Sequence, residues 1–302
     1  MTVAQPPAEG FRSGFACFVG RPNAGKSTLT NALVGQKIAI TSSRPQTTGH
    51  AIRGIVHRED AQIVLVDTPG LHRPRTLLGS RLNDVVRETW AEVDVVGFCV
   101  PATEKVGRGD RFIAEELRKV AAHTPVIAVV TKTDLARPEQ VAERLAEVAA
   151  LMDFAEVVPT SARSGFQVQL LADLLVARLP EGPQLYPDGD LTDEPEDVLV
   201  AELVREAALE GVRDELPHSI AVVVEETIEK KDLLEIYAII YVERSSQKGI
   251  VIGRGGARLK QVGTDARRQI EKLLGTRVHL DLHVKIAEDW QRDPKQLRRL
   301  GF

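Results

Sequence analysis

The sequence predicts an α/β domain with a mostly parallel sheet and helices on both faces, followed by a smaller α+β domain. Three observations predict this. A glycine-rich loop of the pattern G-x-x-x-x-G-K-S lies between an apolar strand and a helix near the N-terminus. Strand-like and helix-like segments then alternate up to residue 178, as in sheets covered on both faces. After an acidic stretch, the order becomes helix, strand, strand, helix, helix, strand. We therefore expect a flexible lead at 1–13, a first domain at 14–180, a linker at 181–198 and a second domain at 199–302.

The composition is that of a globular protein. The chain has 302 residues, of which 43% are hydrophobic and 27% charged, and this length allows two domains with cores. Cys17 and Cys99 both lie in apolar runs, which predicts two core residues in a reducing compartment rather than a disulfide. The sequence has neither an apolar run of about 18 residues nor the apolar segment of a signal peptide, so we expect a cytoplasmic protein.

Charge is distributed unevenly along the chain. The net charge is −4, but residues Ser245–Phe302 carry 13 Lys and Arg against 6 Asp and Glu, a local charge of +7. The rest of the chain therefore carries −11. A basic C-terminal segment on an acidic protein favours a binding site for a polyanion, although a solvated helix face would give the same count.

The glycine-rich loop predicts a phosphate-binding site. It follows the strand Phe15–Val19 and contains Gly20, Gly25, Lys26 and Ser27 at the four fixed positions of the phosphate-binding loop. Glycines allow several backbone N–H groups to point at one anion, and the helix that we expect to open at Ser27 turns its positive end toward it. Lys26 would reach the β- and γ-phosphates, and the Ser27 hydroxyl would bind Mg²⁺.

A second phosphate motif follows a predicted antiparallel pair of strands, Ile52–Val56 and Gln62–Val66. The second strand ends in Asp67-Thr68-Pro69-Gly70, which has the pattern D-x-x-G. A carboxylate at this point after a phosphate-binding loop is placed to hold Mg²⁺ through a water molecule, and the Gly70 N–H to meet the γ-phosphate.

The next segments lead to a predicted guanine site. The pattern predicts helices and strands at Leu78–Glu92, Val95–Val100, Arg111–Ala122 and Val126–Val130. The last strand ends in Thr131-Lys132-Thr133-Asp134. A carboxylate at Asp134 can accept hydrogen bonds from the N1–H and the 2-amino group of guanine, a pair of donors that adenine lacks. The alternative is that Asp134 caps the following helix.

A final strand and helix complete the first domain. The strand Glu156–Pro159 is followed by Thr160-Ser161-Ala162, where small residues let a base lie against the backbone and the Ala162 N–H can meet the guanine carbonyl. The helix Gln167–Arg178 then closes the domain.

These motifs occur in the order and spacing of the translation-factor-like GTPases. The segments GRPNAGKSTL, GQKIAITS, VDTPG followed by Leu71-His72, and VPTSA resemble the Era family of bacterial GTPases, and the resemblance covers almost the whole chain. It implies that the Thr48 hydroxyl, with Thr47 as the fallback, binds Mg²⁺ beside Ser27 and Asp67, and that Lys26, Thr48 and Gly70 serve catalysis. The nucleotide-binding residues expected on this basis are Gly20, Arg21, Pro22, Asn23, Ala24, Gly25, Lys26, Ser27, Thr28, Asp67, Thr68, Pro69, Gly70, Thr131, Lys132, Asp134, Ser161 and Ala162.

Three residues depart from the patterns of related GTPases. Thr131 replaces the usual asparagine of the guanine motif, and we expect its shorter side chain not to reach the phosphate-binding loop, which predicts a modest nucleotide affinity. Gly49 replaces a usual arginine and loosens the backbone there. Leu71 stands where many GTPases carry the glutamine that orients water, an absence that the family shares, so unaided turnover is expected to be slow.

Asn23 resembles the asparagine of potassium-dependent relatives. A K⁺ ion bound there would supply positive charge in the transition state, the role that an arginine finger has elsewhere. The alternative is that the Asn23 side chain stabilises its own loop, and the sequence does not favour either hypothesis.

The second domain follows a stretch that cannot form a core. Residues Glu181–Val198 contain three prolines, seven acidic residues and no basic residue, which predicts a linker. We expect a helix at Leu199–Glu215, strands at Ser219–Glu226 and Leu234–Glu243, then a glycine-rich hinge at 249–256 that leads from the second strand to two helices, and a strand at Val278–Ile286.

The hinge contains Gly253-Arg254-Gly255-Gly256, the G-x-x-G signature of a KH domain, here of type II by its αββααβ order. Two glycines let this turn approach the sugar-phosphate backbone of single-stranded RNA while an apolar groove receives the bases. The family carries a similar RNA-binding domain at its C-terminus. Trp290 is expected to cap the core rather than to stack on a base, and Arg267 and Arg268 to make outer contacts. The expected RNA-binding residues are Lys248, Gly253, Arg254, Gly255, Gly256, Arg258 and Lys260.

The sequence thus predicts a molecular switch that hydrolyses Mg²⁺-GTP by attack of water, with GTP ordering Ser42–His50 and the stretch after Gly70. The resemblance implies that the RNA is the 3′ end of small-subunit ribosomal RNA and that the process is assembly of the small ribosomal subunit; no DNA partner is expected. It also implies association with the inner face of the cell membrane, where contact without an anchor would be peripheral.

Two alternatives of other classes remain at this point. One is a GTPase acting in RNA modification, although no further cysteine-based or glycine-rich site for a methyl donor, folate or redox cofactor is found in the sequence. The other is a nucleotide-sensing RNA-binding module with negligible turnover, which Thr131, Gly49 and the missing glutamine would allow.

Overall fold

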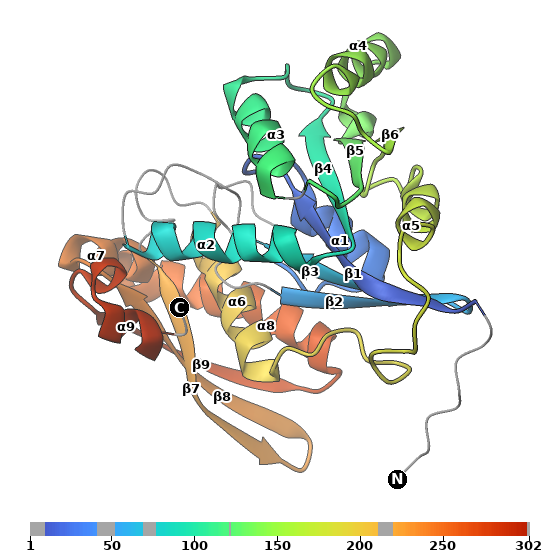
Figure 1. Cartoon of the computed structure of the whole chain (residues 1–302). Helices are drawn as coiled ribbons and strands as arrows, with labels where there is room; N and C mark the ends of the chain where they lie inside the picture. The colour runs from blue at the N-terminus through green and yellow to red at the C-terminus, as the bar shows by residue number, and fades with distance from the viewer. Residues whose placement is uncertain (1–9, 41–51, 69–76, 121, 211–219, 301–302) are drawn as a thin grey trace. The chain divides into compact units, whose positions relative to one another are not determined.

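The computed structural model describes residues 10–40, 52–68, 77–120, 122–210 and 220–300 (Figure 1). The chain divides into two compact units, and within the predicted linker the boundary falls between Asp193 and Glu194. The first unit contains the phosphate-binding loop and the second contains the G-x-x-G turn.

The first unit is built on a six-stranded sheet in the order β2-β3-β1-β4-β5-β6. Neighbouring strands from β3 to β6 pair in parallel, whereas β2 pairs with β3 antiparallel, as the sequence predicted. The strands are β1 (Arg12–Val19), β2 (Ile52–His57), β3 (Ala61–Asp67), β4 (Val95–Pro101), β5 (Val126–Thr131) and β6 (Glu156–Pro159).

Helices cover both faces of this sheet because both faces of its strands are apolar. One core contains Trp90 of α2, Leu117 of α3 and Val148 of α4, and the opposite core contains Leu29 of α1 and Leu175 of α5. The helices are α1 (Lys26–Val34), α2 (Leu77–Glu92), α3 (Arg108–Val120), α4 (Pro138–Ala149) and α5 (Val168–Val176).

Helix α4 is an element that the sequence analysis missed. Its signals were present, because Pro138 occupies the first turn and the backbone N–H of Arg137 donates to the Gln140 side chain. The helix begins four residues after Asp134, the last residue of the guanine motif.

The predicted linker is bound to the first unit over most of its length. The Gln62 side-chain oxygen accepts from the backbone N–H groups of Leu185 (2.7 Å) and Tyr186 (2.9 Å), and the Ile55 N–H of β2 donates to the Leu191 carbonyl (2.9 Å). A strand at the edge of a sheet offers such backbone groups, which explains how a stretch without its own core becomes ordered. Helix α6 (Glu196–Leu209) begins three residues before the start predicted for it.

The second unit has the αββααβ order that was predicted. Its three-stranded sheet has the order β7-β8-β9, with β7 and β8 antiparallel and β8 and β9 parallel. Helices α6 and α8 share one core with the sheet, which includes Val204, Ile240 and Ile270. The remaining elements are β7 (Ala221–Lys230), β8 (Leu233–Val242), α7 (Ser245–Ile252), α8 (Ala257–Leu274), β9 (Val278–Ile286) and α9 (Pro294–Arg299).

Both cysteines are free and buried, as the sequence predicted. Burial raises the pKa of the Cys99 thiol to about 12 and raises that of Cys17 as well, so neither is a reactive thiolate at neutral pH. Trp290 is also buried, as predicted. In the part of the chain that the structure describes, no helix has the length and apolar character needed to cross a membrane.

We expect the substitution Gly97→Ala to lower the free energy of unfolding by about 1–3 kcal/mol, because it overfills a closed core. A Cβ at Gly97 of β4 would lie 2.5 Å from Cδ1 of the Phe18 ring. Urea unfolding of the full chain measures the loss. The second substitution Phe18→Leu should recover part of it by making room, and a Gly97→Ala protein as stable as the parent would contradict this account.

Candidate functional site

The phosphate-binding loop joins β1 to α1, and its backbone requires glycine at two positions. Gly20 has φ 155°, and a Cβ there would lie 2.5 Å from the Cys99 carbonyl oxygen. Gly25, which precedes the first residue of α1, has φ 92°. Asn23 between them also has a positive φ, 63°, a conformation that asparagine tolerates better than most residues. The loop is thus a preformed turn that leads into the N-terminus of a helix.

Lys26 is buried in the loop with its ammonium group directed at backbone oxygens. Its Nζ donates to the carbonyl groups of Gly20 and Arg21, at 3.2 Å each. Burial lowers the pKa of Lys26, and the negative charge of Asp67 works in the opposite direction by favouring the charged form. A buried cation held inside a phosphate-binding loop can stabilise negative charge on a bound phosphate.

Ser27 and Asp67 lie together, as the two motifs predicted. The Ser27 Oγ donates to Oδ2 of Asp67 at 2.8 Å, and Asp67 is buried at the end of β3. A hydroxyl and a carboxylate are hard oxygen donors of the kind that Mg²⁺ prefers, so the residues present fit this ion.

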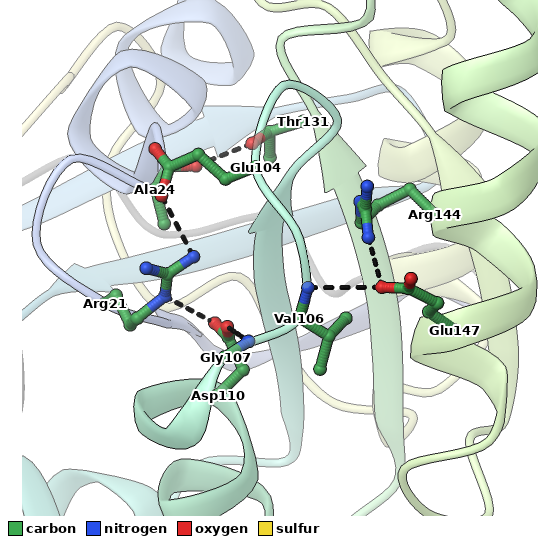
Figure 2. A network of polar contacts seen from close by, with 9 residues as sticks. All are labelled: Arg21, Ala24, Glu104, Val106, Gly107, Asp110, Thr131, Arg144 and Glu147. Carbon is green, nitrogen blue, oxygen red and sulfur yellow. Dashed lines mark hydrogen bonds and ion pairs between the residues drawn. The ribbon is translucent and has the colours of Figure 1, made fainter.

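Thr131 reaches the phosphate-binding loop, and the expectation that it would not was wrong. Its Oγ1 donates to the Ala24 carbonyl oxygen at 2.6 Å, and the side chain is buried (Figure 2). Residue 131 ends β5 close to Gly25, whose added Cβ would lie 3.5 Å from Oγ1, so even a short hydroxyl side chain spans the gap. The replacement of asparagine by threonine therefore preserves the tie between the two motifs.

The predicted guanine-binding residues also come together. Asp134 is exposed, and its Oδ1 accepts from the Ser161 Oγ at 2.7 Å. Ser161 is buried and also accepts from the Ser164 N–H at 3.1 Å, which fixes the hydroxyl beside the carboxylate. Lys132 lies between the end of β5 at Thr131 and a short 3-10 turn that starts at Thr133, and it has φ 57°. Ala162, next to Ser161, is partly exposed.

Several predicted residues lie outside the described residues. They are Thr48, Pro69 and Gly70 of the expected site, together with Thr47, Gly49 and Leu71. The remaining loop residues Pro22 and Thr28 lie in the turn and the first turn of α1, and Thr68 is buried directly after Asp67.

The Arg21 side chain makes contacts that the sequence analysis did not foresee. Its Nε donates to Oδ1 of the buried Asp110 in α3 at 2.8 Å, and its Nη2 lies 3.0 Å from Oε2 of Glu104 (Figure 2). Burial alone would lower the pKa of the Arg21 guanidinium, but the hydrogen bond and charge of Asp110, aided by Glu104, raise it overall. No motif contains Glu104 and Asp110, so only their position in space identifies them.

The second unit contains a groove of about 500 Å³ between α8 and β9. Its wall combines leucines with basic side chains, a combination that suits bases and phosphates. The lining residues are Gly256, Leu259, Lys260, Gly263, Thr264, Arg267, His279, Leu280 and Leu282. Of these, only Gly256, Lys260 and Arg267 were predicted, because β9 follows the G-x-x-G turn by more than twenty residues and carries no motif of its own.

The G-x-x-G turn stands at one end of this groove. Gly253, Gly255 and Gly256 have φ of 73°, 59° and 78°. A Cβ at Gly253 would lie 2.6 Å from Cβ of Arg258, whereas a Cβ at Gly255 would meet nothing within 4 Å. Arg254 and Gly255 are exposed, and Lys248 on α7 is partly exposed. The residues Gly249–Ile252, expected to belong to the hinge, form the last turn of α7 instead.

Arg258 does not point where the sequence analysis expected. Its Nη2 donates to the carbonyl oxygens of Ala208 (3.1 Å) and Glu210 (2.7 Å) at the C-terminal end of α6. A cation at this position satisfies carbonyl groups that the helix leaves without partners and is favoured by the helix dipole. The geometry thus supports a structural role for Arg258 and not the expected phosphate contact.

Comparison with known protein families gives one match for each unit. A family model described as a 50S ribosome-binding GTPase matches residues 15–132. A model of the KH domain matches residues 215–291.

Full-length relatives match as well. The chain is 68% identical to a Streptomyces coelicolor protein named GTPase Era, over 99% of this chain and 98% of that one. It is 67% identical to the GTPase Era of Mycolicibacterium smegmatis, over 97% and 99% of the two chains. A crystal structure of Era in complex with MgGDPNP and nucleotides 1506–1542 of 16S ribosomal RNA matches with a TM-score of 0.91 at 36% identity, covering 96% of this chain and 99% of that one. An Aquifex aeolicus Era variant bound to GDP and AlF4⁻ matches equally well, with a TM-score of 0.91.

We expect Thr131→Val to weaken GDP binding about tenfold, because it leaves the buried Ala24 carbonyl without its hydroxyl donor while preserving the side-chain shape. Thr131→Ser keeps the hydroxyl and should bind GDP within about twofold of the parent. Fluorescence titration with a labelled GDP measures both. Equal affinities of the valine and serine variants would show that the hydrogen bond does not support the loop.

Proposed function

The chain belongs to the Era family of GTPases, and we propose that it is a GTP-driven switch which binds the 3′ end of small-subunit ribosomal RNA during assembly of the small ribosomal subunit. One observation carries the proposal: a single chain holds the complete phosphate-binding loop and a G-x-x-G groove, and it aligns end to end with relatives named GTPase Era. This alignment favours the ribosomal role over a role in RNA modification.

As a member of this family, the chain hydrolyses GTP to GDP and phosphate. We propose that Lys26 stabilises charge on the β- and γ-phosphates, and that Ser27 and Asp67 hold Mg²⁺, which neutralises the phosphate charge when bound. Thr48 and Gly70 would complete the γ-phosphate site. The exposed carboxylate of Asp134, oriented by Ser161, would select guanine by accepting its N1–H and 2-amino group.

The choice of RNA rests on the second unit and on one relative. The family model matched by the first unit is described by the large subunit, 50S, but it covers residues 15–132 only. The relative solved with RNA holds nucleotides of 16S ribosomal RNA and spans both units. Because the groove belongs to the second unit, we give the full-length relative more weight and propose a small-subunit target.

We propose further that the protein acts in the cytoplasm, with any contact at the inner face of the cell membrane being peripheral. We also propose that Asn23 supplies one ligand to a K⁺ ion that contributes positive charge to hydrolysis. This proposal is supported by the position of Asn23 within the phosphate-binding loop, between Arg21 and Gly25, where its backbone has a defined conformation with φ of 63°.

The switch predicts that the GTP state binds RNA more tightly than the GDP state. We expect a GTP analogue to raise affinity for a short single strand of the 16S 3′ end about tenfold over GDP, a coupling of about 1.4 kcal/mol. Fluorescence anisotropy at one fixed salt concentration measures this, because phosphate contacts make affinity depend on salt.

The G-x-x-G turn offers a matched control for this measurement. Gly255→Asp and Gly255→Asn introduce side chains of equal size into open space, at a φ that both residues tolerate. The aspartate should abolish RNA binding by repelling phosphates, and the asparagine should reduce it much less. Equal RNA affinity in both nucleotide states would contradict the switch, and equal loss in both variants would contradict phosphate contact at this turn.

The proposed K⁺ site predicts that replacing K⁺ by Na⁺ slows GTP hydrolysis at least several-fold. Asn23→Gly is the suitable variant, because glycine accepts a φ of 63° and removes only the side chain. Phosphate release by this variant should be slow and equal in the two salts. If the parent protein turns over equally in K⁺ and Na⁺, Asn23 serves only to stabilise the loop.

A further inference from the structure

The side chain of Arg21 extends from the phosphate-binding loop to an acidic site at the start of α3, which is formed by Glu104 and Asp110. Asp110 is fully buried, and its two carboxylate oxygens have separate partners. Oδ1 accepts from the Arg21 Nε and Oδ2 from the Gly107 N–H, at 2.8 Å each (Figure 2). Glu104 adds a second negative charge, 3.0 Å from the Arg21 Nη2. The guanidinium is therefore held in a defined place by groups outside the loop.

The hydrocarbon part of the Arg21 side chain lies against the backbone of Gly109. A Cβ added to Gly109 would lie 2.8 Å from Cδ and 3.2 Å from Cγ of Arg21. Gly109 is inside α3, where alanine is otherwise the better helix former. Because Gly109 has no side chain, the Arg21 side chain can lie along its backbone and reach Asp110.

The segment that carries this acidic site is itself hydrogen-bonded to other elements of the first unit. The Ala102 N–H donates to the Thr131 carbonyl at 2.8 Å, and the Val106 N–H donates to Oε2 of Glu147 at 3.2 Å. Arg144, largely buried on α4, pairs with the same carboxylate (Figure 2). The segment carrying Glu104 is thereby fixed to β5 and α4.

The backbone carbonyl of Arg21 links these contacts of its side chain to the phosphate site. It accepts from the Lys26 Nζ and from the Ala24 N–H, at 3.2 Å each. A shift of the Arg21 residue would move the oxygen that holds the ammonium group and would open the turn between Arg21 and Ala24. The side chain and the carbonyl of one residue thus connect α3 to Lys26.

We propose that Arg21 and Asp110 are a positioning pair, which acts through the Arg21 carbonyl to hold Lys26 and the phosphate-binding loop in the geometry that binds and hydrolyses GTP. The side chains of the pair contact each other, and they act on the nucleotide site through the loop backbone. The proposal rests on the GTPase function proposed above and adds to it a residue outside every nucleotide-binding motif, Asp110.

The first experiment separates positioning from simple stability. Arg21→Met keeps the length of the side chain but leaves the buried Asp110 charge without its partner, so it should lower both the melting temperature and GDP affinity. Adding Asp110→Asn removes that charge while an amide oxygen can still accept from the Gly107 N–H. The double variant should regain most of the melting temperature, yet bind GDP about tenfold more weakly and hydrolyse bound GTP about tenfold more slowly than the parent.

A purely structural pair would give another result. If GDP affinity and hydrolysis recover together with the melting temperature in the double variant, the positioning role is overturned. If the parent protein itself fails to bind GDP or to exceed a Lys26→Ala protein in phosphate release, the GTPase function fails instead, so the two failures can be told apart.

A second experiment uses two glycines at the start of α3 and changes no charge. Gly109→Ala displaces Arg21, whereas at Gly107 an added Cβ makes only ordinary contacts, with Oδ2 of Asp110 at 3.7 Å and the Lys105 carbonyl oxygen at 3.9 Å. We expect Gly109→Ala to weaken GDP binding about fivefold and Gly107→Ala to bind within twofold of the parent. Parent-like GDP binding by the Gly109→Ala protein, with Arg21 still in place by crystallography, would overturn the role given to Gly109.

Discussion

A loop that binds phosphates with its backbone cannot use the same N–H groups to stabilise itself, so it must be held from outside. The first unit meets this constraint with side chains from three other elements. The Thr131 hydroxyl at the end of β5 holds the Ala24 carbonyl, Asp67 at the end of β3 holds the Ser27 hydroxyl, and Asp110 in α3 holds the Arg21 side chain. These contacts require the ends of β3 and β5 and the start of α3 to meet at one edge of the sheet, which parallel pairing with helical crossovers provides.

Much of the fold could be predicted from the sequence, because strands and helices leave periodic patterns. The apolar runs gave β4, β5, β6 and β9 within a residue or two, and the order αββααβ of the second unit was correct. Two features of the fold were missed. Helix α4 follows a strong motif and was overlooked. The acidic linker is hydrogen-bonded to strands β2 and β3 at residues between 185 and 193, and these contacts leave no local pattern in the sequence.

The residues of the candidate site also differ in whether they could be predicted from the sequence. Gly20, Lys26 and Ser27 could be assigned because a phosphate site needs those residue types at fixed spacing, and Asp67 could be assigned by its distance from them. Contacts between distant segments could not, since residue type alone does not give direction. Thr131 looked too short but stands close enough to reach Ala24, and Arg258 looked free to bind RNA but is turned toward the end of α6. A departure from a motif therefore has to be judged by the distance that the new side chain must span.

The two candidate sites also differ in how much recognition their side chains can supply. In the first unit, buried or paired polar groups such as Asp67 and Asp134 have defined orientations, so they can reject a wrong ligand by leaving it without partners. The groove of the second unit is lined by leucines and by the polar side chains of Lys260, Thr264, Arg267 and His279, and its leucines and cations favour any base and any phosphate. Within the described residues β9 pairs with β8 alone, and His279, Leu280 and Leu282 of β9 line the groove. Because contacts between charged side chains and phosphates carry no sequence information, we expect the selection of particular bases to depend more on the polar groups and the shape of the groove than on Lys260 and Arg267.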